Sequence, residues 1–205
     1  MILIDLTRDI YNDMPVFPGD KPVRINQTHQ VNEDGYSNFR IEASFHIGTH
    51  IDAPAHFLEN GIKINDIELD LLCSDAVLID ARNKFFLDTD LINGLEIQSK
   101  MLVFCTMHYN KWGTDEYYSN YPVISHELCD ELIKNKVKMI LLDTPSPDKS
   151  PYEIHPRLFG ANILIAENII NTEKLIGRKN LRIYALPLKA KVCGAPARII
   201  AQYDI

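Results

Sequence analysis

The chain has 205 residues, of which 46% are hydrophobic and 24% are charged, values near the globular average that exclude a disordered or fibrous protein. Twenty-one basic and 28 acidic residues give a net charge of −7, and no basic block is present that could neutralise nucleic-acid phosphates. The longest apolar run, residues 101–105, is far shorter than the ~20 residues of a membrane-spanning helix. Four scattered cysteines without a Cys-x-x-Cys pair, and a first segment without signal-peptide character, predict a cytoplasmic protein with reduced thiols.

Short apolar segments rich in β-branched residues recur along the chain, and their length predicts strands rather than helices. Residues 41–47 alternate between apolar and polar side chains, as in a strand with one buried face. The runs 77–79, 101–105 and 139–142 are continuously apolar, which predicts strands buried on both faces. The predicted strands are residues 2–6, 41–47, 76–80, 101–105, 137–142, 163–166, 182–188 and 197–203.

Fewer segments have the character of helices. The clearest is 125–136, where Ser125 is the expected N-cap. A second helix is expected to begin at Asp88 or Thr89, and a short third one covers 171–177. Because no internal repeat or linker interrupts the pattern, the sequence predicts one α/β domain over residues 1–205, with more strand than helix.

Ionisable side chains are concentrated in one short segment. His46, His50 and His56 lie within eleven residues, and Asp52 lies between the last two. Imidazole nitrogens and a carboxylate are ligands that suit zinc, manganese or iron. In an extended segment His50 and Asp52 point to the same face, roughly 6.6 Å apart along the backbone. His46 has the same parity but is roughly 13 Å from His50 in a straight strand, so the backbone is expected to bend at Gly48.

Each of these residues, taken singly, has an ordinary explanation as a core or capping side chain. As a group they do not, because burying several ionisable groups together without an ion carries a large desolvation penalty. The segment therefore predicts a metal site.

The same segment carries a family resemblance. His46-x-Gly48-Thr49-His50-x-Asp52-x-Pro54-x-His56 resembles the signature of the cyclase-like metal-dependent hydrolases, a family that includes bacterial kynurenine formamidase and isatin hydrolase. The likeness extends over nearly the whole chain and keeps the family's order. It is carried by residues 5–7, 14–20, 60–80 and 143–146, by His155 and Glu167, and by residues 185–188 and 194–198.

The resemblance implies a swivelling β/β/α fold with a mixed β core and a few flanking helices, assembled as a homodimer or homotetramer. It also implies two divalent ions, zinc or else manganese. His46, His50 and Asp52 would hold the first ion, Asp52 would bridge, and His155 with Glu167 would complete the second site. Without the resemblance, His155 would be assigned to a loop and Glu167 to the solvated start of a helix.

The implied reaction is hydrolysis of a C–N bond by a metal-activated water. In this scheme His56 is not a ligand but the proton shuttle, a role that suits an imidazole near neutral pH. The expected substrate is an aryl formamide such as N-formylkynurenine, with isatin-like cyclic amides and carbamates as alternatives. Phe17 and His108, together with Tyr109 and Trp112, are expected to contact this small molecule. Residues 106–109 differ from the Thr-Gly-Trp that kynurenine formamidases tend to have there. This difference affects the expected substrate contacts and not the metal ligands.

Two other functions fit part of the pattern. His50, Asp52 and a distant His155 form the two-histidine, one-carboxylate set of Fe(II) oxygenases. This assignment leaves His46, His56 and Glu167 without a role. A non-catalytic metal-binding protein that keeps the site is the second alternative, because a fold does not fix a function. An intact His56 argues against it.

Overall fold

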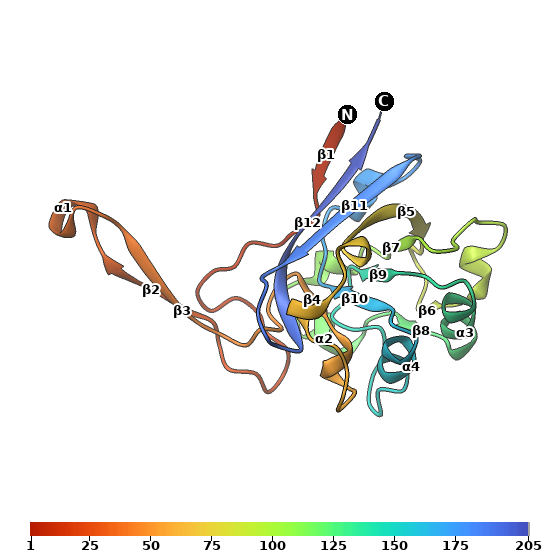
Figure 1. The fold of residues 1–205 in the computed structure, drawn as a ribbon, viewed down its shortest axis with the longest axis horizontal. Helices are drawn as coiled ribbons and strands as arrows, with labels where there is room; N and C mark the ends of the chain where they lie inside the picture. Colours follow the sequence, from red (N-terminus) through yellow and green to blue (C-terminus); the bar gives the residue numbers. More distant parts are fainter. Residues whose placement is uncertain (205) are drawn as a thin grey trace.

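The computed structural model describes residues 1–204, and its centre is an eight-stranded mixed sheet (Figure 1). The strand order is β1-β12-β11-β5-β7-β9-β10-β4, and because β4 also pairs with β12, seven of these strands form a closed ring. The neighbours β5, β7, β9 and β10 are parallel, whereas the pairs made by β1, β4, β11 and β12 are antiparallel. The strands are β1 Ile2–Asp5, β4 His50–Asp52, β5 Cys73–Asp80, β7 Met101–Cys105, β9 Met139–Leu142, β10 Leu164–Glu167, β11 Leu181–Pro187 and β12 Gly194–Tyr203.

The parallel strands separate two hydrophobic cores. Met101 and Val103 of β7 join side chains of β4, β11 and β12 in the interior of the ring. Leu102 and Phe104 point to the opposite face and pack against helices. Since both faces are buried, these strands are continuously apolar, and the predicted α/β class with a mixed β core is confirmed.

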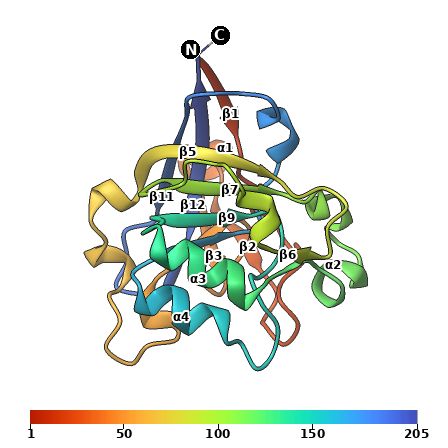
Figure 2. The same cartoon turned by 90° about the vertical axis from the view of Figure 1, so that its right-hand side faces the viewer.

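Two helices, α3 His126–Lys134 and α4 Ile154–Gly160, cover the outer face of the parallel strands (Figure 2). The Ser125 hydroxyl accepts a hydrogen bond from the Leu128 N–H at 3.0 Å, which confirms the predicted N-cap of α3. The helices expected after Asp88 and Asn171 are only 3₁₀ turns, and α4 was not predicted. A further helix is α2 Asp115–Ser119, and the turns are η1 Pro54–His56, η2 Ile64–Asp66, η3 Leu69–Leu71, η4 Thr89–Ile92, η5 His108–Lys111 and η6 Thr172–Leu175.

A hairpin, residues 24–42 and here called the arm, projects away from the body (Figure 1). It consists of β2 Arg24–His29, a short helix α1 Val31–Asp34 and β3 Asn38–Glu42. Only residues 41 and 42 of the strand predicted over 41–47 belong to β3, where both are exposed, and residues 43–47 form no strand, so that prediction is wrong. Strand pairing ends at Glu42 because the next residues carry the chain from the arm into the ring.

A separate parallel pair, β6 Phe86–Leu87 and β8 Val123–Ile124, lies beside the helices. Within residues 1–204, no helix has the length and apolar character that crossing a membrane requires.

Candidate metal centre

The predicted ligands meet where β4 lies between β10 and β12. His50 and Asp52 are the two ends of β4, and the Nε2 of His50 is 3.3 Å from the Oδ1 of Asp52, so their predicted common face is confirmed. Strand β10 runs antiparallel to β4 and places Glu167 directly opposite His50. The distance from His50 Nε2 to Glu167 Oε2 is 3.4 Å, and all three side chains are buried.

A bend in the backbone brings His46 to the same place. Gly48 has φ +54°, a left-handed conformation that glycine adopts without steric cost, and this is the bend that the spacing predicted. As a result, the Nδ1 of His46 lies 2.7 Å from the Oδ1 of Asp52.

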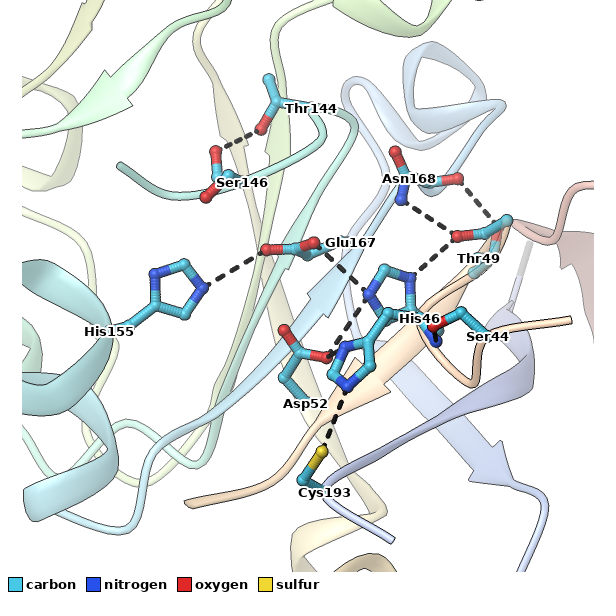
Figure 3. Close-up of polar contacts among 12 residues, drawn as sticks. Ser44, His46, Thr49, Asp52, Thr144, Ser146, His155, Glu167, Asn168 and Cys193 are labelled. Atoms are coloured by element: carbon cyan, nitrogen blue, oxygen red, sulfur yellow. Dashed lines mark hydrogen bonds and ion pairs between the residues drawn. The ribbon is translucent and has the colours of Figure 1, made fainter. Parts of the chain in front are cut away.

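His155 approaches from the opposite side, on helix α4 (Figure 3). Its Nε2 is 3.6 Å from the Oε1 of Glu167. Both side chains are buried, and Glu167 ends a strand, so the loop and helix-start positions expected without the resemblance are wrong. Asp52 belongs to two groups whose ligand atoms lie within 4.8 Å of one another: His46, His50, Asp52 and Asp52, His155, Glu167.

The hydrogen bonds of the imidazoles show that this cluster fits a cation. The Nδ1 of His50 lies 2.9 Å from the carbonyl oxygen of Gly48, which can only accept, so the Nδ1 carries a hydrogen. The Nδ1 of His155 is paired in the same way with Asp148 Oδ1 at 2.6 Å. In their neutral forms both rings therefore aim an Nε2 lone pair at carboxylate oxygens, and the buried Oδ1 of Asp52 has no aligned hydrogen-bond donor. A divalent ion satisfies all of these groups, and the outer hydrogen bonds orient its ligands.

The electrostatics of the cluster favour positive charge. Burial opposes the charged form of His50, but the Asp52 carboxylate outweighs it and raises the pKa of His50 to about 9. Burial is likewise outweighed at His155, where hydrogen bonds to Asp148 and Glu167 raise the pKa to about 10. Burial and the nearby Asp52 charge raise the pKa of Glu167. The same field that holds protons on the imidazoles also stabilises a metal cation.

His56 occupies a different position from the buried ligands. It ends the η1 turn, is exposed to solvent, and stacks on the His46 ring with centroids 4.1 Å apart. Partial withdrawal from water, together with three neighbouring imidazoles, lowers the pKa of His56 to about 4 against the opposing charge of Asp52. The ring is therefore neutral at neutral pH and free to accept a proton.

A polar network that sequence reasoning missed holds the bend in place. Asn168, the residue after Glu167, donates from Nδ2 to the Gly48 carbonyl oxygen at 3.0 Å and accepts from the Tyr117 hydroxyl at 2.6 Å. The Thr49 hydroxyl donates to the Asn168 carbonyl oxygen at 2.8 Å. Since Gly48 also orients His50, this network positions a ligand. Nothing in the local sequence pattern marks Asn168 or Asp148 for these roles.

A cavity of about 310 Å³ opens over the cluster. Phe17 and Trp112, two of the four residues expected to contact the substrate, line it together with Phe57. His108 does not line it, which corrects that expectation. The His108 ring is buried against Tyr117, at 5.1 Å between centroids, and its Nε2 contacts the Tyr117 carbonyl oxygen at 2.9 Å. Tyr109, which also does not line the cavity, donates its hydroxyl hydrogen to Glu173.

Comparisons with known proteins agree with this architecture. The family model described as putative cyclase matches residues 4–149. Kynurenine formamidase of Bacillus thuringiensis subsp. konkukian is 27% identical over 203 residues, which cover 96% of this chain and 95% of the relative. Isatin hydrolase A from Ralstonia solanacearum superposes with a TM-score of 0.88 at 23% identity, covering 99% of this chain and 92% of the other. A structure described as a potential metal-dependent hydrolase with cyclase activity gives a TM-score of 0.78 at 26% identity, covering 98% and 96%.

Proposed function

The chain belongs to the putative cyclase family, and on that premise we propose that it is a metal-dependent hydrolase that cleaves a C–N bond in an amide. One observation carries the proposal: two buried imidazoles turn their Nε2 atoms towards two carboxylates, on the floor of a cavity. The kynurenine formamidase and isatin hydrolase relatives support the same class of reaction.

The cofactor that we propose is a pair of divalent ions, zinc or alternatively manganese. Support comes from the two ligand groups that share Asp52. Such ions, when bound, lower the pKa of water and polarise a carbonyl oxygen. The protein's own contribution is to orient the ligands, through the Gly48 carbonyl for His50 and the Asp148 carboxylate for His155.

His56 is the proposed proton shuttle. Its neutral ring accepts a proton from the attacking water and returns it to the departing nitrogen, so the net reaction adds water across the C–N bond. Support comes from its position at the cavity and from its ring, which no hydrogen bond ties up among the described residues. In this proposal the buried residues bind the metal ions, and the exposed His56 transfers the proton.

The substrate that we propose is an aryl formamide, of which N-formylkynurenine is an example. The cavity is of ligand size, and Phe17, Phe57 and Trp112 give it aromatic walls that suit a ring. An isatin-like cyclic amide or a carbamate would use the same walls and the same chemistry, and these are the alternative substrates.

An Fe(II) oxygenase is disfavoured by the way the residues are grouped. That function requires His50, Asp52 and His155 as one ligand set, whereas Asp52 forms one close group with His46 and His50 and another with His155 and Glu167. A non-catalytic metal-binding protein leaves the cavity and the exposed His56 without a role.

The deciding experiment is an assay of the metal-loaded full chain against an N-formyl anilide, isatin and a phenyl carbamate. We expect hydrolysis of the formyl anilide that a chelator abolishes and added zinc restores. Hydrolysis of none of the three, with metal bound at full stoichiometry, would favour the non-catalytic alternative. Oxygen uptake that depends on a 2-oxo acid would revive the oxygenase.

We further propose that the chain assembles as a homodimer or homotetramer through the arm. A lone two-stranded hairpin is only marginally stable in water, so the arm needs a packing partner. It also exposes two large apolar side chains to solvent, Phe39 at 59% and Ile41 at 54% of their surfaces. A second copy of the chain is the partner that would bury them. The four free thiols support a reducing, cytoplasmic setting for the assembly.

A further inference from the structure

Cys193 lies beside residues 46–56, which supply His46, His50 and Asp52, and it has no role in the proposed hydrolysis. It immediately precedes β12, and its carbonyl oxygen accepts a hydrogen bond from the Ala53 N–H at 2.8 Å. The next residue, Gly194, is paired with Asp52 across the two strands. This register fixes Cys193 next to residues that are far away in the sequence.

The Cys193 thiol faces the outer side of the His46 ring (Figure 3). The Sγ is 3.3 Å from the Nε2 of His46, on the opposite edge from the Nδ1 that approaches Asp52. The His56 ring stacks on the same imidazole with an interplanar angle of 29°. One ligand atom from each of His46, His56 and Cys193 lies within 4.8 Å of the other two.

Small side-chain rotations would bring the ligand atoms of His46, His56 and Cys193 to the separations of a metal site. Bonds of about 2.0 Å to nitrogen and about 2.3 Å to sulfur place the ligand atoms of a tetrahedral zinc ion roughly 3.5 Å apart. A thiolate with two imidazoles selects thiophilic ions over magnesium or calcium.

We propose that His46, His56 and Cys193 form an outer metal site that binds a thiophilic divalent ion such as zinc or cadmium. Binding replaces the S–H bond of Cys193 with a metal–sulfur bond and releases the proton to solvent. Ions from solution can reach this site directly, because His56 is exposed and Cys193 is half-buried, whereas His50, Asp52, His155 and Glu167 are all buried.

The outer site competes with the hydrolytic centre. A neutral imidazole has one lone pair, so His46 can serve an ion near Asp52 through Nδ1 or an ion near Cys193 through Nε2, but not both. An ion in the outer site also occupies the lone pair that His56 needs for proton transfer. Excess thiophilic metal should therefore inhibit the enzyme, and this consequence, unlike the binding itself, rests on the proposed function.

The binding is tested by titrating the full chain with Co²⁺ and recording the thiolate-to-cobalt charge-transfer absorption in the near ultraviolet. We expect the band in the wild type, its loss in Cys193→Ser and Cys193→Ala, and its retention in Cys73→Ser, a half-buried thiol on β5. Circular dichroism checks that the variants are folded. Absence of the band from the wild type, or its persistence in both folded Cys193 variants, would overturn the proposal.

Inhibition is measured separately with excess zinc, relative to each variant's own rate at stoichiometric metal. We expect the half-inhibitory zinc concentration of Cys193→Ser to rise at least roughly tenfold, the smallest effect typical of losing even an outer partner of a metal ligand. An unchanged value would overturn the inhibitory role. If no substrate is hydrolysed at all, the proposed function fails, whereas the cobalt band still decides whether the outer site exists.

Discussion

His50 and His56 belong to the same eleven-residue segment but differ in what surrounds them. His50 is buried between Asp52 and Glu167, whereas His56 is exposed beside the cavity. We predict that His56→Ala retains the inner metal ions and loses about 10²–10⁴-fold in kcat, the usual contribution of general acid–base catalysis. His50→Ala should lose metal as well as activity. Metal content and steady-state rates of the two purified variants check this.

His126→Ala is the matched control, because His126 is exposed on α3 and contacts Glu153 and Arg157 rather than the cluster. It should leave metal content and rate unchanged. Wild-type turnover in His56→Ala would show that the shuttle is assigned to the wrong residue.

The raised pKa values of His50 and His155 make metal binding depend on pH. With pKa values of about 9 and 10, both rings are protonated at pH 7, and each must lose its Nε2 proton to become a ligand. We predict the release of about two protons at pH 7 when both inner sites fill. As the pH rises towards 9, fewer protons remain to be displaced, so fewer are released and the apparent affinity increases.

Calorimetry of zinc binding in buffers with different ionisation enthalpies measures this proton release. The His126→Ala protein should release the same number of protons as the wild type. A binding enthalpy at pH 7 that is independent of the buffer would contradict the charged state assigned to the two rings.

At the scale of elements, the contact of β12 with β4 controls the position of His46. A Cβ added to Gly194 would lie 2.3 Å from the Cε1 of His46, far inside van der Waals contact. We predict that Gly194→Ala displaces the His46 ring and lowers the stoichiometry of bound metal, while the sheet, and therefore the circular dichroism, is retained. Gly160→Ala is the control, because a Cβ at Gly160 meets no atom within 4 Å. Unaltered metal binding in Gly194→Ala would show that the ring has another accessible position.

The strands were predictable from the sequence to a greater extent than the helices. The strand β7 has the predicted bounds because a continuous apolar run buried on both faces leaves a strong local signal. Helix α4 was missed, since it is short and is stabilised by packing Leu158 and Phe159 on the sheet rather than by helix propensity. At residues 43–47 the sequence instead predicted a strand that is not there, because alternation of apolar and polar residues does not establish that a partner strand is present.

At the scale of the whole molecule, the arm is the element that the ring does not explain. It leaves Phe39 and Ile41 exposed on a hairpin that projects away from the body (Figure 1). We predict that Phe39→Lys together with Ile41→Lys shifts the assembly towards monomers, because charges would then be buried in the proposed interface. Sedimentation velocity at several protein concentrations measures the shift.

Leu69→Lys is the matched control, since Leu69 is 77% exposed but lies on the η3 turn of the body. Its sedimentation should match that of the wild type. A wild-type chain that sediments as a monomer at micromolar concentration would refute assembly through the arm.

The sequence by itself determined the part of the site that depends on local periodicity. His50 and Asp52 share a face because strands repeat every two residues, and Gly48 permits the bend that returns His46 to them. Only the tertiary structure placed Glu167 opposite His50, His155 against Glu167 and Cys193 against His46. The reason is physical: strand register and helix packing are set by contacts between distant segments, and local sequence patterns do not record which segments those are.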